Sequence, residues 1–214
     1  MSLNLYVQVA NTELLKTKLG ALLRCKDIIK AKNLTIIGVD YNGFYIEAAK
    51  TCIQDQNMTD HISVHTLSIY DEEGLQKILA SRQGQVDSVY FSGSFSLLPD
   101  PKGALATVLK VLKPKGEIYI TQTYQKRYSP VMSRVKPLIK FVTTIDFGQL
   151  ITTADIGMLL NSVEDLSVVE HVVIKGSIDN YWQAAYMSVL VRKGYGGGKV
   201  ELGKEKKRGF WKWF

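Results

Sequence analysis

Apolar and polar positions alternate in short blocks along most of this chain. Residues 3–10 alternate apolar with polar side chains, which predicts a strand, and residues 34–40 are an apolar, β-branched run typical of a strand buried on both faces. Between them, apolar positions at helical spacing predict a helix over residues 13–32, after the N-cap types Asn11 and Thr12. The chain is therefore expected to begin as strand, helix, strand.

The middle of the chain repeats this order. Within residues 98–116, Pro101 suits an early helical position, and Pro114 with Gly116 is expected to end the helix. Strands that alternate with helices favour parallel β-α-β units in an open sheet covered on both faces. The other predicted elements are helices over residues 43–56 and 72–82 and strands over residues 61–70, 86–95 and 117–124.

After residue 125 the pattern changes. Residues 125–165 are a longer, mixed connection, with helices predicted near residues 131–142 and 153–162. Two further strands, residues 165–176 and 181–193, are separated by about four residues, which is short enough for a β-hairpin.

The composition fits one domain with a separate tail. The chain has 214 residues, of which 46% are apolar, enough for a full core. Residues 1–193 are expected to form the domain, residues 194–198 a glycine-rich linker, and residues 199–214 a tail. The tail has six basic and two acidic residues, so it carries +4 of the net charge of +7. The expectation of an anionic partner therefore rests on the tail.

Several function classes find no support in the sequence. No apolar run approaches the length of about 18 residues that a membrane span needs, and the start lacks the features of a secretory signal. Cys25 and Cys52 lie far apart outside any C-x-x-C pair, and the three histidines have no spaced partner. We expect reduced thiols in an intracellular compartment and no metal site.

Two stretches resemble the class I S-adenosylmethionine-dependent methyltransferase family. GVDYNGFYIEAAK (38–50) is similar to that family's second strand and following helix, and VDSVYFSGSFSLLPDPKGALATVLKVLKPKGEIYITQT (86–123) to its fourth strand, K-P-x-G turn and fifth strand. The resemblance extends over about residues 3–193 and is greatest to the small-molecule branch, which includes quinone methyltransferases. It implies a Rossmann-like α/β fold: a mostly parallel seven-stranded sheet with a C-terminal antiparallel hairpin and helices on both faces.

The resemblance also implies a cofactor site. Asp40 matches the carboxylate that accepts hydrogen bonds from both ribose hydroxyls, a task suited to an acceptor-only group, and Tyr41 would lie against the adenine. The alternative is that Asp40 caps the next helix. Ser68 stands where the family has an acid that bonds the adenine amine, and Ser92 would line the mouth of the pocket.

The family's first glycine turn has no counterpart in either alignment. If residues 3–10 are the first strand, the turn falls on Ala10 to Glu13; if residues 20–23 end the motif, Lys16, Thr17 and Lys18 replace its glycines. Side chains would then stand where the methionine part of the cofactor approaches the backbone. We therefore expect impaired binding of S-adenosylmethionine.

No catalytic set is evident. Tyr124, Tyr128, Asp146 and Asp155 are polar residues in or near the 125–160 connection, but they form no recognisable pattern. Methyl transfer depends mainly on proximity, with a base in some cases. Residues 140–148 are expected to cover the open end of the sheet, with a substrate lid as the alternative.

The tail combines cations with aromatic side chains. Acidic lipid, RNA and a protein groove are alternative partners for it, and a free solvated tail is the fourth possibility. The residues concerned are Lys207, Arg208, Phe210, Trp211, Trp213 and Phe214.

The sequence thus predicts a methyltransferase-like protein with impaired cofactor binding that serves as a structural or assembly subunit of a larger complex, docked in part through its tail. The alternatives are an active S-adenosylmethionine-dependent methyltransferase on a small or lipid-soluble substrate and, third, an RNA-binding factor. The basic charge balance and the kinship with quinone enzymes favour mitochondria over the cytoplasm as its location.

Overall fold

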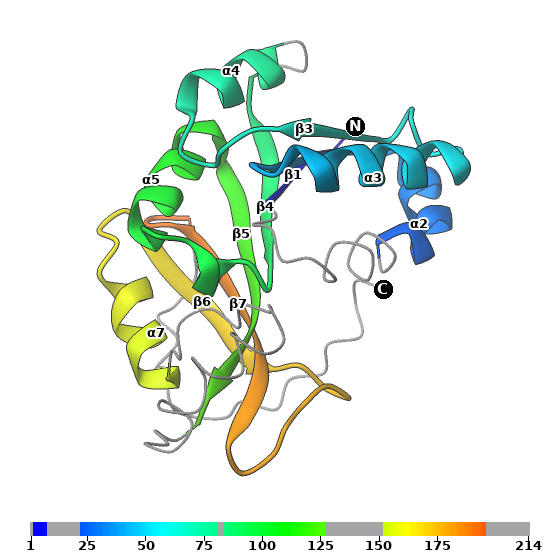
Figure 1. Ribbon diagram of the computed structural model, residues 1–214. Helices are drawn as coiled ribbons and strands as arrows, with labels where there is room; N and C mark the ends of the chain where they lie inside the picture. Colours follow the sequence, from blue (N-terminus) through cyan, green and yellow to red (C-terminus); the bar gives the residue numbers. More distant parts are fainter. Residues whose placement is uncertain (1, 8–21, 81–83, 127–151, 196–214) are drawn as a thin grey trace.

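The computed structural model describes residues 2–7, 22–80, 84–126 and 152–195. Its centre is a seven-stranded sheet with the order β3-β2-β1-β4-β5-β7-β6 (Figure 1). The first five strands are parallel, and β7 is antiparallel to both of its neighbours. The strands are β1 (Ser2–Val7), β2 (Leu34–Asp40), β3 (Ile62–Thr66), β4 (Val86–Ser92), β5 (Leu112–Gln125), β6 (Leu166–Val173) and β7 (Gln183–Arg192).

The strand order reverses at β1. The chain builds outward from β1 to β3 and then returns to place β4 on the other side of β1. In open α/β sheets, ligands bind outside the carboxyl ends of the strands at such a switch point. The edge of the sheet where β1, β2 and β4 end is therefore where a ligand site is expected.

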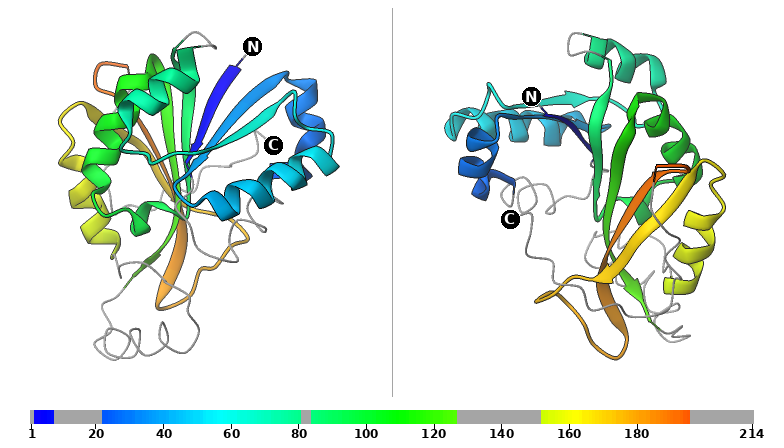
Figure 2. Two further views of the ribbon diagram at one scale, coloured as in Figure 1. Left: turned by 45° about the horizontal axis from the view of Figure 1, so that its top comes forward. Right: turned by 180° about the vertical axis from the view of Figure 1, so that it is seen from behind.

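Helices cover the sheet from two sides (Figure 2). Ile36 of β2 belongs to an apolar cluster with residues of α2 (Lys26–Ala31) and α3 (Gly43–Asp55). The next residue, Ile37, belongs to a larger cluster with residues of α4, α5 and α7. This alternation along β2 is what a strand buried on both faces requires. The three helices of the larger cluster are α4 (Glu72–Ala80), α5 (Pro101–Val111) and α7 (Thr153–Asn161).

The K-P-x-G segment lies inside a strand, which corrects the expected start of β5. Helix α5 ends at Val111 and β5 begins at once with Leu112, which pairs with Val86 before the register shifts. A Cβ on Gly116 would lie 2.9 Å from the Asp87 carbonyl oxygen, closer than real Cβ contacts. The glycine thus permits a bulged strand where a stop followed by a strand from residue 117 was expected.

Two further boundaries were predicted wrongly. The expected strand over residues 61–70 ends at Thr66, because the next residues turn and the Asp71 amide donates to the Ser68 carbonyl at 3.0 Å. The connection between β6 and β7 spans residues 174–182 instead of about four residues. Both strand predictions were too long, because the alternation of apolar and polar residues continues into the turns that follow or precede these strands.

Other predictions are only partly covered. The helix expected over residues 13–32 is described from residue 22 onward, where it contains α2. The helix expected near residues 131–142, the cover expected at residues 140–148 and the tail at residues 199–214 lie outside the described residues.

Candidate functional site

Asp40 is the last residue of β2 and is almost completely buried, at 1% exposure. Its Oδ1 accepts a hydrogen bond from the Asn42 amide at 2.8 Å, and its Oδ2 has no hydrogen-bond partner within the part of the chain that the structure describes. Burial raises the pKa of the Asp40 carboxyl from 3.8 to about 6, against the opposing effect of the Asn42 hydrogen bond. Such a buried oxygen is costly to leave unsatisfied.

Helix α3 takes its cap from a different residue. The Asn42 side chain accepts a hydrogen bond from the Phe44 amide at 3.0 Å, and Asn42 is the N-cap of α3. The alternative that Asp40 caps this helix is therefore wrong. The sequence pattern had not singled out Asn42 as the cap of this helix, although an asparagine just before a helix is itself an N-cap signal.

The residues expected at the adenine lie beside Asp40. Tyr41 is 60% exposed, so its ring is open to solvent next to the buried carboxylate. The Leu67 amide donates to the Asp40 carbonyl oxygen at 2.9 Å, which joins the ends of β2 and β3. Ser68 follows directly, but its Oγ accepts from the Tyr70 amide at 3.3 Å and thus supports a local turn.

Ser92 ends β4 on the far side of β1 and is 8% exposed. Two strand spacings separate it from β2, a distance of about 10 Å. Gly93 follows with a φ of 59° and donates its amide to the Thr121 carbonyl oxygen at 2.7 Å. The left-handed backbone that glycine favours thus turns the chain away from the end of β4.

The position of β1 agrees with the alignment that takes residues 3–10 as the first strand. β1 ends at Val7, paired with Val39 on one side and Phe91 on the other. Residues 8–19, which follow β1 in the sequence, contain no glycine. Those residues lie outside the described part of the chain.

The two catalytic candidates that the structure describes, Tyr124 and Asp155, have other surroundings than Asp40. Asp155 forms a capping box with Thr152 at the start of α7, and the hydrogen bonds from Thr152 lower the pKa of the Asp155 carboxyl. Tyr124 is 1% exposed and belongs to the apolar cluster of α4, α5 and α7. Tyr128 and Asp146 lie outside the described residues.

A second polar group surrounds Tyr124. His171 stacks on Tyr186 with ring centroids 4.7 Å apart, and its Nδ1 lies 2.8 Å from Ser188 Oγ. Burial lowers the pKa of the His171 imidazole to about 4 and raises that of the Tyr124 hydroxyl. These residues come from β5, β6 and β7, so no local motif in the sequence could have indicated the group.

Within the ranges that the structure describes, no three His, Cys, Asp or Glu side chains are grouped so that they could hold a metal ion. No helix in those same ranges is long and apolar enough to cross a membrane.

Solved structures of other proteins share this fold. The chain superposes on the cyclase SpnF with a TM-score of 0.60 at 12% identity, over 89% of this chain and 75% of that one. The MccD protein gives 0.62 at 12% identity, over 90% of each chain. An S-adenosylmethionine-dependent methyltransferase from Aquifex aeolicus gives 0.55 at 13% identity, over 88% and 81%. At these identities the likeness shows the fold alone.

The sequence itself gives the family. No curated protein sequence matches the chain. Residues 22–193 match the model of a methyltransferase domain, which is most of the chain. The resemblance drawn from residues 38–50 and 86–123 is thereby confirmed, and the chain belongs to the class I S-adenosylmethionine-dependent methyltransferase family.

Proposed function

We propose that this domain keeps the ribose-binding half of an S-adenosylmethionine site and lacks the half that holds the methionine. It would bind adenosine-containing ligands weakly and act mainly as a structural or assembly subunit of a larger complex. Its tail, residues 199–214, would make part of the contact with that complex, and mitochondria are the proposed location. The observation that carries the ligand part is the Oδ2 of Asp40, which no residue in the described ranges satisfies.

A ribose diol matches the Asp40 carboxylate. One carboxylate offers acceptor sites on both oxygens, and a vicinal diol presents two hydroxyl donors. Oδ1 already accepts one amide, while Oδ2 has no partner among the residues that the structure describes and would accept from a ligand. Hydrogen bonds that involve a charged group are worth roughly 1.5–3 kcal/mol each.

The missing glycines support the proposal that binding of S-adenosylmethionine is impaired. A methionine carboxylate and amine bind close to backbone, which requires residues without a side chain at the turn. The chain has none between β1 and Gly20. Losing one such charged interaction alone would weaken binding by about ten- to a hundredfold.

An active methyltransferase on a small or lipid-soluble substrate is the second candidate. The family match over residues 22–193 favours it, because that match includes the ends of β2 and β4. It requires that residues 8–19 bind the methionine through a turn of a different kind.

Calorimetric titration of the full chain with adenosine and with S-adenosylmethionine distinguishes the two candidate functions. If only the ribose half is kept, the two dissociation constants should agree within about tenfold, since the methionine adds little. Micromolar binding of S-adenosylmethionine with adenosine more than about a hundredfold weaker would contradict the proposal and favour the active enzyme.

A further inference from the structure

The connection between β6 and β7, residues 174–182, projects beyond the sheet as a long loop (Figures 1 and 2). We call it the hairpin tip. Gln125, the last residue of β5, pairs with Gln183, the first residue of β7, so the tip lies past the carboxyl end of β5. The tip thus extends from the same edge of the sheet at which β2 ends in Asp40.

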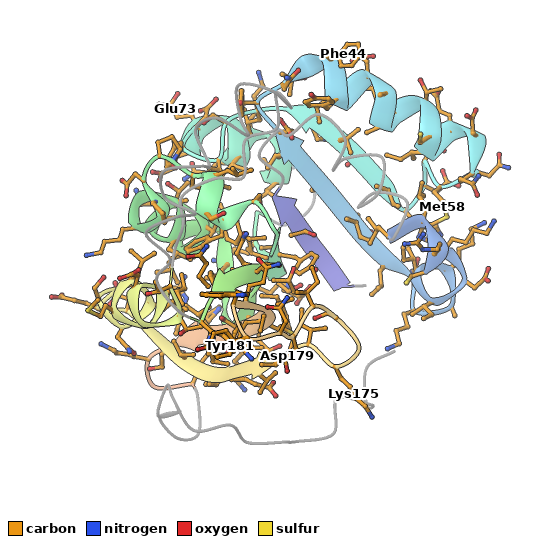
Figure 3. All side chains as sticks on the ribbon, turned by 60° about the horizontal axis from the view of Figure 1, so that its bottom comes forward. Phe44, Met58, Glu73, Lys175, Asp179 and Tyr181 are labelled. Atoms are coloured by element: carbon orange, nitrogen blue, oxygen red, sulfur yellow. The ribbon has the colours of Figure 1, made fainter. Side chains whose placement is uncertain are left out.

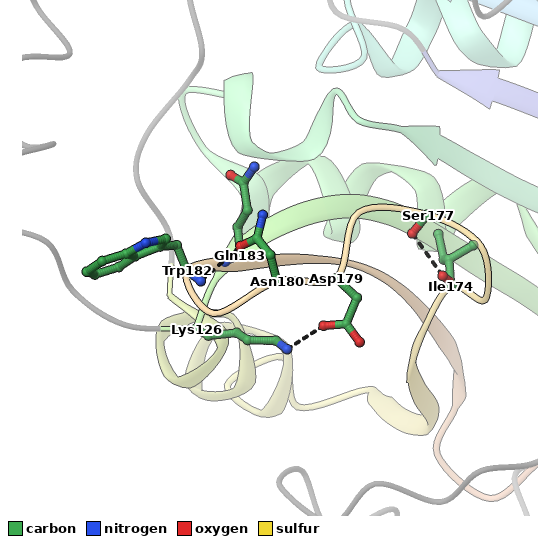
Figure 4. A network of polar contacts seen from close by, with 7 residues as sticks. All are labelled: Lys126, Ile174, Ser177, Asp179, Asn180, Trp182 and Gln183. Carbon is green, nitrogen blue, oxygen red and sulfur yellow. Dashed lines mark hydrogen bonds and ion pairs between the residues drawn. The ribbon is translucent and has the colours of Figure 1, made fainter.

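Polar contacts hold the hairpin tip in shape (Figure 4). Asn180 Oδ1 accepts from the amides of Trp182 and Gln183 at 2.9 and 3.0 Å. Lys126, just after β5, forms an ion pair with Asp179, and its amide donates to the Trp182 carbonyl at 2.8 Å. The backbone of the tip is therefore well satisfied, and its conformation does not depend on burying its own apolar side chains.

Those apolar side chains are instead directed outward. Ile178, Tyr181 and Trp182 are 51%, 59% and 55% exposed. The two rings meet edge to face with centroids 5.0 Å apart, so they form one surface. An isolated exposed apolar residue needs no explanation, but three large ones within five residues of a projecting loop indicate a contact surface.

The charge around the tip is positive. Asp179 is paired with Lys126, and Lys175 is exposed on the far side of the loop from Tyr181 (Figure 3). Within the tip Lys175 and Asp179 balance, and Lys126 beside it brings the local net charge to +1, on a chain of net charge +7. Tyrosine and tryptophan combine an apolar body with a polar end, which suits the boundary between lipid headgroups and acyl chains.

We propose that the hairpin tip docks on an anionic lipid surface, with Ile178, Tyr181 and Trp182 inserted among the headgroups and Lys175 against their phosphates. A convex loop with outward aromatic rings and a cation can enter such an interface, whereas a helical ligand would need a groove. Docking in this way would turn the carboxyl edge of the sheet toward the lipid. Docking through the tip would not involve Asp40, and vesicle binding is measured without a nucleoside.

Sedimentation with vesicles tests it. The full-length chain should partition onto vesicles of phosphatidylcholine with about one third phosphatidylserine, and more weakly onto phosphatidylcholine alone, with binding that falls as salt rises. Tyr181→Ala and Trp182→Ala should each lower the partition coefficient about tenfold. Tyr195→Ala is the matched control, because Tyr195 is 55% exposed and follows the opposite end of β7, and it should change the coefficient less than about twofold.

Fluorescence locates the contact. The chain has three tryptophans, so the full-length Trp211→Phe/Trp213→Phe variant leaves Trp182 alone and keeps aromatic side chains in the tail. On anionic vesicles its emission should shift to the blue and be quenched by brominated lipid. If the chain bound neither type of vesicle, the proposal would be contradicted, and a protein partner for the tip would be favoured. Equal partition of Tyr181→Ala and Tyr195→Ala, or an unchanged Trp182 spectrum on bound vesicles, would also overturn it.

Discussion

Two junctions of this domain reach a helix through an aspartate, and the two aspartates have different roles. Before α5, Asp100 is exposed and its Oδ1 accepts from the Gly103 amide at 3.0 Å, with Pro101 in the first helical turn. Before α3, Asp40 is buried and Asn42 makes the cap. The first aspartate thus satisfies the helix, while the second keeps an oxygen that the described residues leave unsatisfied.

The difference shows what distinguishes a structural acid from a ligand-binding one. Both residues follow an extended segment and precede a helix, so local sequence alone allows either role for each. Burial and hydrogen-bond partners distinguish the two roles. A capping side chain can stay in water, whereas a buried oxygen without a partner raises the free energy of the folded state. Function is a common reason for such a cost to persist.

The largest expected contrast is in ligand binding. Asp40→Asn replaces one acceptor oxygen by a donor amide and should weaken adenosine binding by at least about tenfold. Asp100→Asn is the matched control and should leave the affinity unchanged. Calorimetric titration of both variants measures the contrast, and equal affinities for the two would remove the distinction between the junctions.

The pH dependence of stability should differ next. The folded-state pKa of Asp40, about 6, lies above the unfolded value of 3.8, so the folded protein holds this proton more tightly. Asp40 therefore destabilises the fold fully above a pH of about 6, and this penalty disappears as the pH falls toward about 4. Over that window the wild type should gain on the order of 1–3 kcal/mol relative to Asp40→Asn.

Urea unfolding of the two proteins at a series of pH values measures this gain. Parallel stability curves for wild type and Asp40→Asn would show that Asp40 titrates normally in the folded state. Asp100→Asn supplies the control, and its curve should run parallel to that of the wild type over the same window.

Helix caps should give a smaller effect of equal size at both junctions. Asn42→Ala and Asp100→Ala each remove a side-chain acceptor from a helix N-terminus and should cost about 1 kcal/mol of unfolding free energy. Asp40→Ala should cost less than either, or stabilise the fold at neutral pH. A larger loss for Asp40→Ala than for Asn42→Ala would argue that Asp40 has a structural role after all.

The smallest effect concerns the link between the β3–α4 connection and the N-cap of α5. The Tyr70 hydroxyl donates to the Asp100 carbonyl and accepts from the Asp100 amide, each at 3.0 Å, on the solvent-exposed surface. Tyr70→Phe should lower the unfolding free energy by about 0.5–1 kcal/mol without changing adenosine affinity. Thermal unfolding resolves a change of this size, and an altered adenosine affinity would mean that the link reaches the ligand site.

Much of the fold could be predicted from local pattern, because buried strands and amphipathic helices leave distinct periodicities. The apolar run at residues 34–40 and the helix expected over residues 43–56 predicted β2 and α3 closely. The start of β5 was missed, since the bulge at Gly116 depends on the neighbouring strand carrying Asp87. Local signals cannot report a contact with a strand about 30 residues away.

The candidate site was predictable only in part. Asp40 could be found through the family pattern, and the tail residues and the turn after β1 stay predictions because they lie outside the described residues. The orphan oxygen of Asp40 and the exposed Trp182 could not be read from the sequence. Both depend on where the chain places each side chain relative to water.

The pKa of the Asp40 carboxyl, followed by carbon NMR in the free and the adenosine-saturated full chain, tests the central claim most directly. The free protein should titrate at about 6. Saturation with adenosine should lower this value, because ribose hydroxyls that donate to the carboxylate favour its charged form. An Asp40 pKa that is the same with and without bound adenosine would contradict the assignment of this residue as a ribose ligand.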